Sequence, residues 1–266
     1  MARLSRLLFR VGKEKMTKEI IIDDNDRQNA GRYTEIAGNY RQDWRGESAI
    51  DLVQKYHAFL EMLGDGKKRI LDVGCGTGKA SLFFAKLGHQ VSCLDLSTGM
   101  LGETMNQKND DHDLNATLAN MKRLPFLSNS FDGLWTMAAV VHLPQGDRKT
   151  ALSEFFRVLK PNGVLGLSAQ NRLYPKHIQR IFQSCLFDIG YDNNNQYYQQ
   201  WKKPADIVHE FSIMRMLIDG YAFMDGRHWY FPTIYELQSS LREAGFLINN
   251  VNSPFERRID ILAVKR

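Results

Sequence analysis

Between residues 69 and 168, short apolar runs alternate with amphipathic stretches, a pattern that predicts β-strands alternating with α-helices. The apolar runs predict strands at residues 69–73, 90–94, 116–118, 133–136 and 164–168. Apolar residues at helical spacing predict the intervening helices at residues 77–87, from Ser97 onward and at 148–159. This order is typical of βαβ units, so we expect a parallel sheet with helices on both faces.

The same periodicities extend the fold in both directions. Two helices are predicted before the first strand, at residues 32–45 and 48–63. Thr233 and Glu236 have the spacing of a capping box, which predicts a helix that stops at Gly245. The last two strands are predicted at residues 246–251 and 258–264. The sequence therefore predicts an α/β, Rossmann-like doubly wound fold with a mostly parallel, seven-stranded sheet.

Residues 172–232 interrupt this alternation and are rich in aromatic and polar side chains. Ligands of open α/β sheets bind at the carboxyl ends of the strands, so we interpret this segment as an inserted substrate or cap lobe over that edge, between the fifth strand and the last helix. Within it, Arg227, His228 and Tyr230 are candidates for substrate contact, with aromatic packing against the sheet as the alternative. The expected division is a basic, flexible tail at 1–30, a main domain at 31–171 and 233–266, and the lobe at 172–232.

The formal charge of +5 comes from the first 18 residues, which carry six bases and one acid. The rest of the chain balances 29 bases with 29 acids, which weakens the case for a nucleic-acid partner. Besides a flexible tail, a membrane-surface helix and an Arg-rich targeting segment are alternatives for the basic stretch.

The composition fits one α/β domain with an accessory lobe, since 43% of the 266 residues are apolar. Cys75, Cys93 and Cys185 are far apart and form no C-x-x-C pair, so neither a disulfide framework nor a metal site is expected. A reducing, cytoplasmic setting fits this use of cysteine. No apolar run approaches the roughly 20 residues that span a bilayer, so we expect no transmembrane segment.

Three glycines, Gly74, Gly76 and Gly78, follow the first predicted strand and precede a helix, which is typical of a loop that approaches a ligand closely. Lys79 stands where a dinucleotide fingerprint requires glycine, which disfavours a nicotinamide-binding protein. Asp72 at the entry to the loop would repel a pyrophosphate but suits a cationic ligand. Asp95 ends the second strand, where an acid can accept hydrogen bonds from both hydroxyls of a ribose.

Five motifs together resemble the class I S-adenosylmethionine (SAM) dependent methyltransferases, in particular the branch called methyltransferase type 11. They are Ile70-Leu-Asp-Val-Gly-Cys-Gly-Thr-Gly78, Leu94-Asp-Leu-Ser97 with Met100, Leu124-Pro-Phe126, Ser130-Phe-Asp132 and Leu159-Lys-Pro-Asn-Gly163. The resemblance implies that SAM is the cofactor and S-adenosyl-L-homocysteine the product. The cofactor residues that it implies are Tyr40, Asp72, Gly74, Cys75, Gly76, Gly78, Asp95, Leu96, Met100, Asn120, Met121 and Met137. Asn120 departs from the acid that the family often has, although its carbonyl can still accept from an adenine amino group.

The resemblance also implies direct displacement, in which an O, N, C or S atom of the acceptor attacks the methyl group. His142 lies where this class brings residues toward that group and is a candidate general base, with a structural loop histidine as the alternative. Tyr33 is a candidate substrate contact, with helix packing as the alternative.

A small or medium organic acceptor is expected because of the aromatic segment. A tRNA or other RNA methyltransferase and a non-catalytic SAM-binding partner subunit stay open as alternatives. Methylation of DNA bases is disfavoured, since Thr136-Met-Ala-Ala139 stands where an Asn-Pro-Pro-Tyr motif would be.

Overall fold

Seven strands form one sheet in the order β10-β11-β7-β6-β3-β4-β5. The computed structural model describes residues 9–11, 14–16, 20, 22–43, 48–173, 220–252 and 256–266. The sheet strands are β3 (Arg69–Val73), β4 (Gln90–Asp95), β5 (Leu114–Leu118), β6 (Phe131–Met137), β7 (Leu159–Gln170), β10 (Phe246–Val251) and β11 (Arg258–Lys265). Strands β3 to β7 pair in parallel, whereas β11 is antiparallel to both of its neighbours. The predicted Rossmann-like, mostly parallel, seven-stranded sheet is confirmed.

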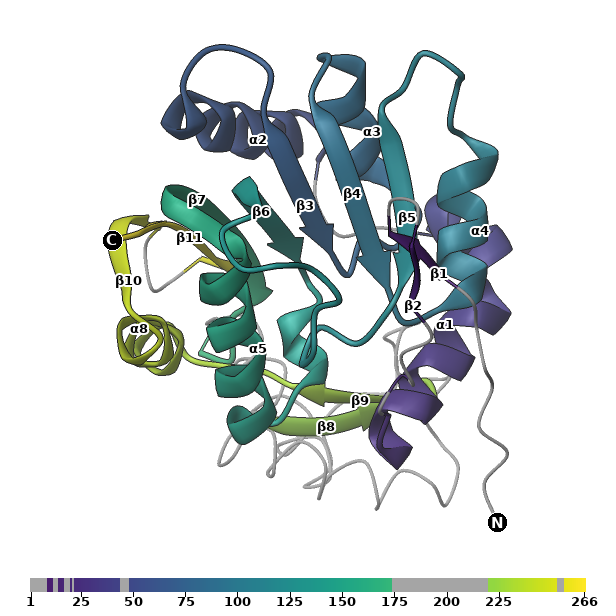
Figure 1. Ribbon diagram of the computed structural model, residues 1–266. Helices are drawn as coiled ribbons and strands as arrows, with labels where there is room; N and C mark the ends of the chain where they lie inside the picture. Colours follow the sequence, from purple (N-terminus) through teal and green to yellow (C-terminus); the bar gives the residue numbers. More distant parts are fainter. Residues whose placement is uncertain are drawn as a thin grey trace, which may run out of the picture.

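Helices cover both faces of this sheet, as Figure 1 shows. Their bounds are α1 (Asp24–Asp43), α2 (Ala49–Leu63), α3 (Lys79–Lys86), α4 (Thr98–Asn106), the 3-10 turn η1 (Val140–His142), α5 (Gln145–Val158) and α8 (Ile234–Glu243). One apolar core joins the sheet to α5 and α8 through residues such as Phe155 and Leu241. A second core joins the other face to α2 and α3 through Phe59 and Phe84. The strands are therefore buried on both sides, as their nearly continuous apolar runs require.

Side-chain caps begin the helices where the sequence predicted them. The Ser97 hydroxyl accepts from the Met100 backbone N–H at 3.1 Å. At α8 the capping box is complete, because the Thr233 hydroxyl accepts from Glu236 N and the Glu236 carboxylate accepts from Thr233 N. Both contacts satisfy backbone donors that a helix start leaves unpaired.

Helix α1 begins at Asp24, so the helix predicted at 32–45 starts too late, and α1 extends into the segment 1–30 that the sequence assigned to the tail. The reason lies in the face that this helix buries near its start. Its buried residues there are polar, Asp26 and Asn29, each 7% exposed, so no apolar period marks the first two turns. The Asp23 carboxylate accepts from Asp26 N at 2.8 Å and caps the new start.

The predicted lobe at 172–232 is described only in its first two residues and its last part, since residues 174–219 lie outside the described ones. That last part forms an antiparallel hairpin of β8 (Tyr221–Met224) and β9 (Arg227–Tyr230). The hairpin lies across the edge of the sheet toward which the arrows of β3, β4 and β6 point, next to α1 (Figure 1). In the basic segment, β1 (Phe9–Val11) pairs with β2 (Glu14–Met16).

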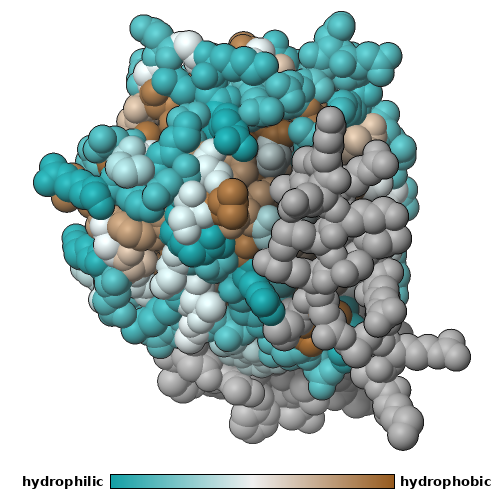
Figure 2. Space-filling view, in the orientation of Figure 1, coloured by the Kyte–Doolittle hydropathy of each residue, from teal (hydrophilic) through white to brown (hydrophobic). Residues whose placement is uncertain are grey.

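The apolar residues exposed at the surface are spread out. Ile50, Leu127 and Tyr235 are each 70% exposed or more but belong to separate parts of the fold. Figure 2 accordingly shows a largely hydrophilic face with apolar residues in small groups. In the part of the chain that the structure describes, no helix is both long enough and apolar enough to cross a membrane.

Candidate active site

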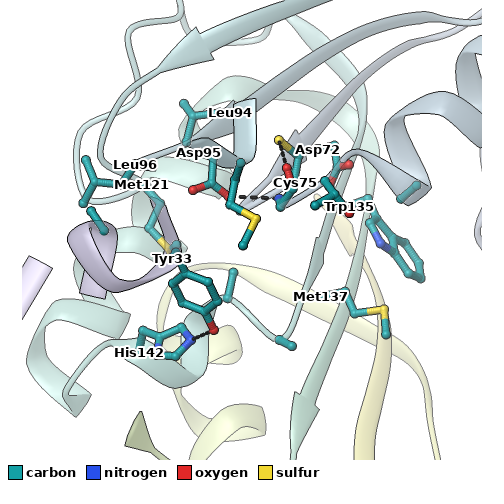
Figure 3. A pocket seen from close by; sticks show the side chains of 18 of the residues that line it. Tyr33, Asp72, Cys75, Leu94, Asp95, Leu96, Met121, Trp135, Met137 and His142 are labelled. Carbon is teal, nitrogen blue, oxygen red and sulfur yellow. Dashed lines mark hydrogen bonds between the residues drawn. The ribbon is translucent and has the colours of Figure 1, made fainter. Parts of the chain in front are cut away.

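A cavity lies at the carboxyl edge of the sheet, where α1 and the loops after β3, β4, β5 and β6 meet (Figure 3). Thirteen of the residues predicted from the sequence line it: Tyr33, Tyr40, Asp72, Gly74, Cys75, Gly76, Asp95, Leu96, Met100, Asn120, Met121, Met137 and His142. The fold thus brings residues more than 100 positions apart in the sequence to one site.

The glycine loop after β3 forms part of the cavity wall. Gly76 has a φ of +56° and open space where a Cβ would stand, so the bare backbone faces the cavity. Gly78 has a φ of +77°, and a Cβ there would lie 2.5 Å from the Thr104 side chain. Gly78 is not among the residues that line the cavity, so its role as a direct cofactor contact stays a prediction. It lets the loop turn tightly into α3 against α4.

Asp95 is held at the end of β4 by two backbone N–H groups. Gly76 N donates to Oδ2 and Ser97 N donates to Oδ1, both at 2.9 Å. Removal from bulk water raises the pKa of this carboxyl, while the N–H donors oppose that shift. Each oxygen keeps further lone pairs, which can accept from ligand hydroxyls.

Asp72 comes from β3 and is 2% exposed. The Ser81 hydroxyl donates to Oδ2 at 2.5 Å, which fixes the carboxyl against α3. Burial raises the pKa of Asp72 to about 7, and the Ser81 hydrogen bond opposes this shift. A buried carboxyl with a raised pKa is typical of a functional site, and a cationic group beside it would favour its ionised form.

The charges around the cavity fit a ligand that carries positive charge and hydroxyl donors. Asp26, Asp72 and Asp95 line the cavity, and Lys79 is the one lysine or arginine among the lining residues that the structure describes. SAM carries an ammonium, a sulfonium and a ribose diol, so its chemistry matches this donor and acceptor set.

Asn120 lies in the cavity wall, but its side chain is already engaged. Its Nδ2 donates to Asp26 Oδ2 at 2.8 Å, and its Oδ1 accepts from Lys122 N at 3.0 Å. Lys122 Nζ lies 3.0 Å from the same Asp26 oxygen and also pairs with Asp23 and Asp147. The sequence analysis did not single out Asp26. Its carboxylate lies beside Asn120, the position where the family often has an acid.

His142 and Tyr33 lie together on one side of the cavity, with Trp135 and Met137 on the other (Figure 3). Tyr33 Oη is 2.8 Å from His142 Nε2, and His142 Nδ1 is 2.8 Å from the backbone oxygen of His228. Burial lowers the pKa of His142 to about 4, although the bond to the His228 backbone opposes the shift. Burial likewise raises the pKa of Tyr33 well above its usual value.

Arg227, His228 and Tyr230 do not line the cavity, so the structure does not bring these three predicted contacts into it. The Arg227 guanidinium lies 4.6 Å from the Tyr33 ring centre and pairs with Asp225. Tyr230 Oη accepts from Asn25 on α1 at 3.2 Å. Their side chains attach the hairpin to α1, which is closer to the packing alternative.

Most of the missed lining residues are apolar or small. They are Ala30, Leu52, Tyr56, Ala80, Leu94, Ala119, Trp135, Ala138, Ala139 and Leu143, together with the polar Asp26, Asn29, Thr77 and Lys79. In the sequence they read as core positions of helices and strands, so no signal separated them from ordinary packing. No cluster of three or more His, Cys, Asp or Glu suited to a metal occurs within the described ranges.

Comparison with known proteins agrees with this site. A family described as a methyltransferase domain matches residues 70–163. A malonyl-[acyl-carrier protein] O-methyltransferase of Salmonella typhimurium is 36% identical over 99 residues, covering 37% of this chain and 38% of that protein. A glycine/sarcosine/dimethylglycine N-methyltransferase of Actinopolyspora halophila is 36% identical over 104 residues, which are 36% of this chain and 17% of that protein. The chain thus spans less than half the length of these two relatives.

Among solved structures, a SAM-dependent methyltransferase from Methanosarcina mazei superposes with a TM-score of 0.56 at 22% identity. The match covers 77% of this chain and 96% of that one, which shows the shared fold. The glycine loop, Asp72 and Asp95 all lie within or beside the matched segment and line one cavity. Residues 70–163 therefore match a methyltransferase domain, in a chain that has the fold of a solved SAM-dependent methyltransferase.

Proposed function

We propose that this chain transfers a methyl group from SAM to a small or medium organic acceptor by direct displacement and releases S-adenosyl-L-homocysteine. One observation carries the proposal: the glycine loop, Asp72 and Asp95 converge on a single cavity that continues to His142 and Met137. The glycine loop, Asp72 and Asp95 suit the cofactor, and His142 and Met137 line the same cavity, where a second reactant would approach the methyl group.

The residues divide into two roles along the cavity. Asp95 would accept from the ribose hydroxyls, while Asp72 and the Gly74 to Gly76 backbone would hold the cationic amino-acid end. Leu96, Met100 and Met121 supply the apolar surface for the adenine, with Asn120 and Asp26 beside them. The cofactor supplies an already activated methyl group, so the protein mainly positions the acceptor and excludes water.

Aromatic and apolar side chains line much of the cavity. They include Tyr33, Tyr56, Trp135 and Met137, which suit a compact organic molecule better than a charged polymer. The balanced charge outside the first 18 residues also favours a small molecule over RNA. The relatives named as O- and N-methyltransferases support the same class. We also propose a cytoplasmic location, which the free thiols of Cys75 and Cys93 support.

Calorimetric titration with SAM and with S-adenosyl-L-homocysteine tests the proposal. We expect the wild type to bind both, and Asp95→Asn to bind each about 10 to 100 times more weakly, because charge-assisted hydrogen bonds are lost. Asp111→Asn, at an exposed acid outside the cavity, is the matched control and should leave both affinities unchanged.

A methyl-release screen over small molecules and tRNA then identifies the acceptor class. Binding of neither ligand by the wild type would contradict the proposed function. Turnover of tRNA alone would support the cofactor but refute the small-molecule acceptor.

A further inference from the structure

The His228 backbone carbonyl determines which way the hydrogen bonds at the cavity wall run. A carbonyl oxygen can only accept, so His142 Nδ1, at 2.8 Å, must carry the ring proton and donate it. In the neutral ring, Nε2 then has a lone pair, and the Tyr33 hydroxyl at 2.8 Å must donate to it. The lowered pKa of His142, about 4, keeps the ring neutral near pH 7.

Hydrogen bonds from Asn29 and stacking by Arg227 hold this arrangement in place. Asn29 Oδ1 accepts from His228 N at 2.7 Å, and Asn29 Nδ2 donates to His228 O at 3.3 Å. Asn29 is 7% exposed and lies on α1, the helix that also carries Tyr33. The Arg227 guanidinium stacks on the Tyr33 ring at 4.6 Å. The tyrosine, the histidine and the hairpin carbonyl are therefore fixed relative to one another.

Because the Tyr33 hydrogen is committed to His142, the Tyr33 oxygen can only accept, and a ligand would share its lone pairs with the neighbouring Arg227 and Tyr40. Tyr33 and His142 both line the cavity that Asp72 and Asp95 also line. A reactant with an O–H or N–H group can donate to the Tyr33 oxygen. A carboxylate has no proton to donate and would be repelled by the carboxylates of Asp72 and Asp95. The geometry thus discriminates between classes of methyl acceptor.

We propose that Tyr33 binds the O–H group that is methylated and relays its proton to His142, so that the acceptor is a hydroxyl compound and not a carboxylate. This inference rests on the proposed methyltransferase function and specifies the substrate class and the proton path of the same site.

The step balances in atoms and charge. The acceptor atom forms its bond to the methyl carbon, and the electron pair of the broken methyl–sulfur bond stays on sulfur. The acceptor's proton passes to Tyr33 Oη as the Tyr33 proton passes to His142 Nε2. The positive charge that leaves sulfur therefore reappears on the imidazolium, and the site keeps its total charge.

The low basicity of His142 is compatible with this role. An O–H group becomes strongly acidic only as its oxygen is alkylated, so the proton leaves late and a weak base suffices. The same low basicity lets the imidazolium release its proton to solvent before the next turnover. Arg227 above the Tyr33 ring opposes the effect of burial on the Tyr33 pKa and so stabilises negative charge on its oxygen during the transfer.

Nitrogen-15 NMR of the His142 ring tests the proton positions without requiring turnover. In wild-type protein with S-adenosyl-L-homocysteine bound, we expect a protonated Nδ1 and a lone pair on Nε2. Tyr33→Phe, which keeps the ring but removes the hydroxyl, should shift the Nε2 resonance and leave the affinity for S-adenosyl-L-homocysteine within about twofold. Tyr235→Phe, at a tyrosine 70% exposed on α8, is the matched control and should shift nothing.

Three ring compounds of similar size then test the acceptor class: phenol, benzylamine and benzoate. We expect methylation of phenol but not of benzoate, and a loss of kcat with phenol of at least about 100-fold in Tyr33→Phe. Methylation of benzylamine needs no relay, because an alkylated amine keeps its proton, and methylation of benzylamine without phenol would argue against the proposal. A proton on Nε2 in the wild type, methylation of benzoate alone, or an unchanged kcat in Tyr33→Phe would each overturn the relay. If none of the three compounds is methylated, the NMR result decides.

These outcomes separate the relay from the proposed function. Failure of the wild type to bind S-adenosyl-L-homocysteine refutes the methyltransferase function. Normal binding with the wrong ring tautomer refutes only the relay.

Discussion

Replacement of Asp72 by Asn should make the ligand-free protein more stable and its stability less dependent on pH. The carboxyl is 2% exposed, and burial raises its pKa from 3.8 to about 7. Between these two values the folded protein holds a proton that the unfolded chain has lost. Stability therefore falls as pH rises, by about 1.4 kcal/mol per pH unit for this group. From pH 5 to pH 7 the loss is about 2 kcal/mol, and Asp72→Asn should abolish it.

Urea unfolding of wild type and Asp72→Asn at pH 5, 6 and 7, without cofactor, measures how much of the pH dependence of the unfolding free energy comes from Asp72. The difference between the two proteins is the informative quantity, because titrations that they share cancel in it. Asn keeps an oxygen that can accept from the Ser81 hydroxyl at the same place, so the packing changes little. Asp111→Asn, at an exposed acid, controls for the loss of one negative charge.

In SAM binding, unlike in stability, the wild type should surpass Asp72→Asn. A cationic ligand beside Asp72 favours the ionised carboxyl, so the affinity of the wild type for SAM should fall as pH drops below about 7. Asp72→Asn should bind more weakly at pH 8 and show no such dependence. If the difference in unfolding free energy between wild type and Asp72→Asn stayed constant from pH 5 to pH 7, it would refute the claim that burial raises the pKa of Asp72.

Four further predictions concern other parts of the site. Gly76→Ala should fold with a stability loss of about 1–2 kcal/mol, because alanine is strained at positive φ, yet fail to bind SAM in calorimetry, since its methyl group would face the cavity. Gly78→Ala should lose clearly more stability in the same urea assay, because its Cβ would also meet Thr104; equal losses would argue against that clash. Lys122→Met should destabilise the protein by about 1–2 kcal/mol and weaken SAM binding, since three carboxylates lose their partner; unchanged values of both would show that the network is inert. His142 should show no protonation by NMR between pH 8 and pH 5.5, because its pKa is lowered to about 4, and a midpoint near 6.5 would contradict its burial.

The cofactor half of the site was predictable because its chemistry is local in the sequence. Gly76 needs a positive φ next to a strand end, and Asp72 and Asp95 terminate strands of a clear apolar pattern. Each requirement falls on one short segment, so residue type and spacing suffice to reveal it.

The other half of the site depends on contacts between distant segments. The first turns of α1 bury Asp26 and Asn29, and a buried polar face leaves no apolar period to detect. The tautomer of His142 depends on a carbonyl 86 residues away, on a hairpin whose register no local pattern sets. Arg227 looked like a substrate contact in the sequence because a charged residue among aromatics suits either binding or stacking, and only the fold distinguishes them.

The hydrogen bonds between Asn29 and the His228 peptide make the N-terminal helix and the hairpin a single exchangeable module, although 199 positions separate them. A chimera that imports the segment around the hairpin from a relative, to alter acceptor choice, would leave Asn29 facing a foreign backbone. The imported hairpin would then lack its hydrogen bonds to Asn29, and His142 would lack a carbonyl oxygen at the right place to accept from its Nδ1. A chimera designed to change acceptor choice should therefore exchange α1 together with the hairpin and keep the glycine loop and the central strands unchanged.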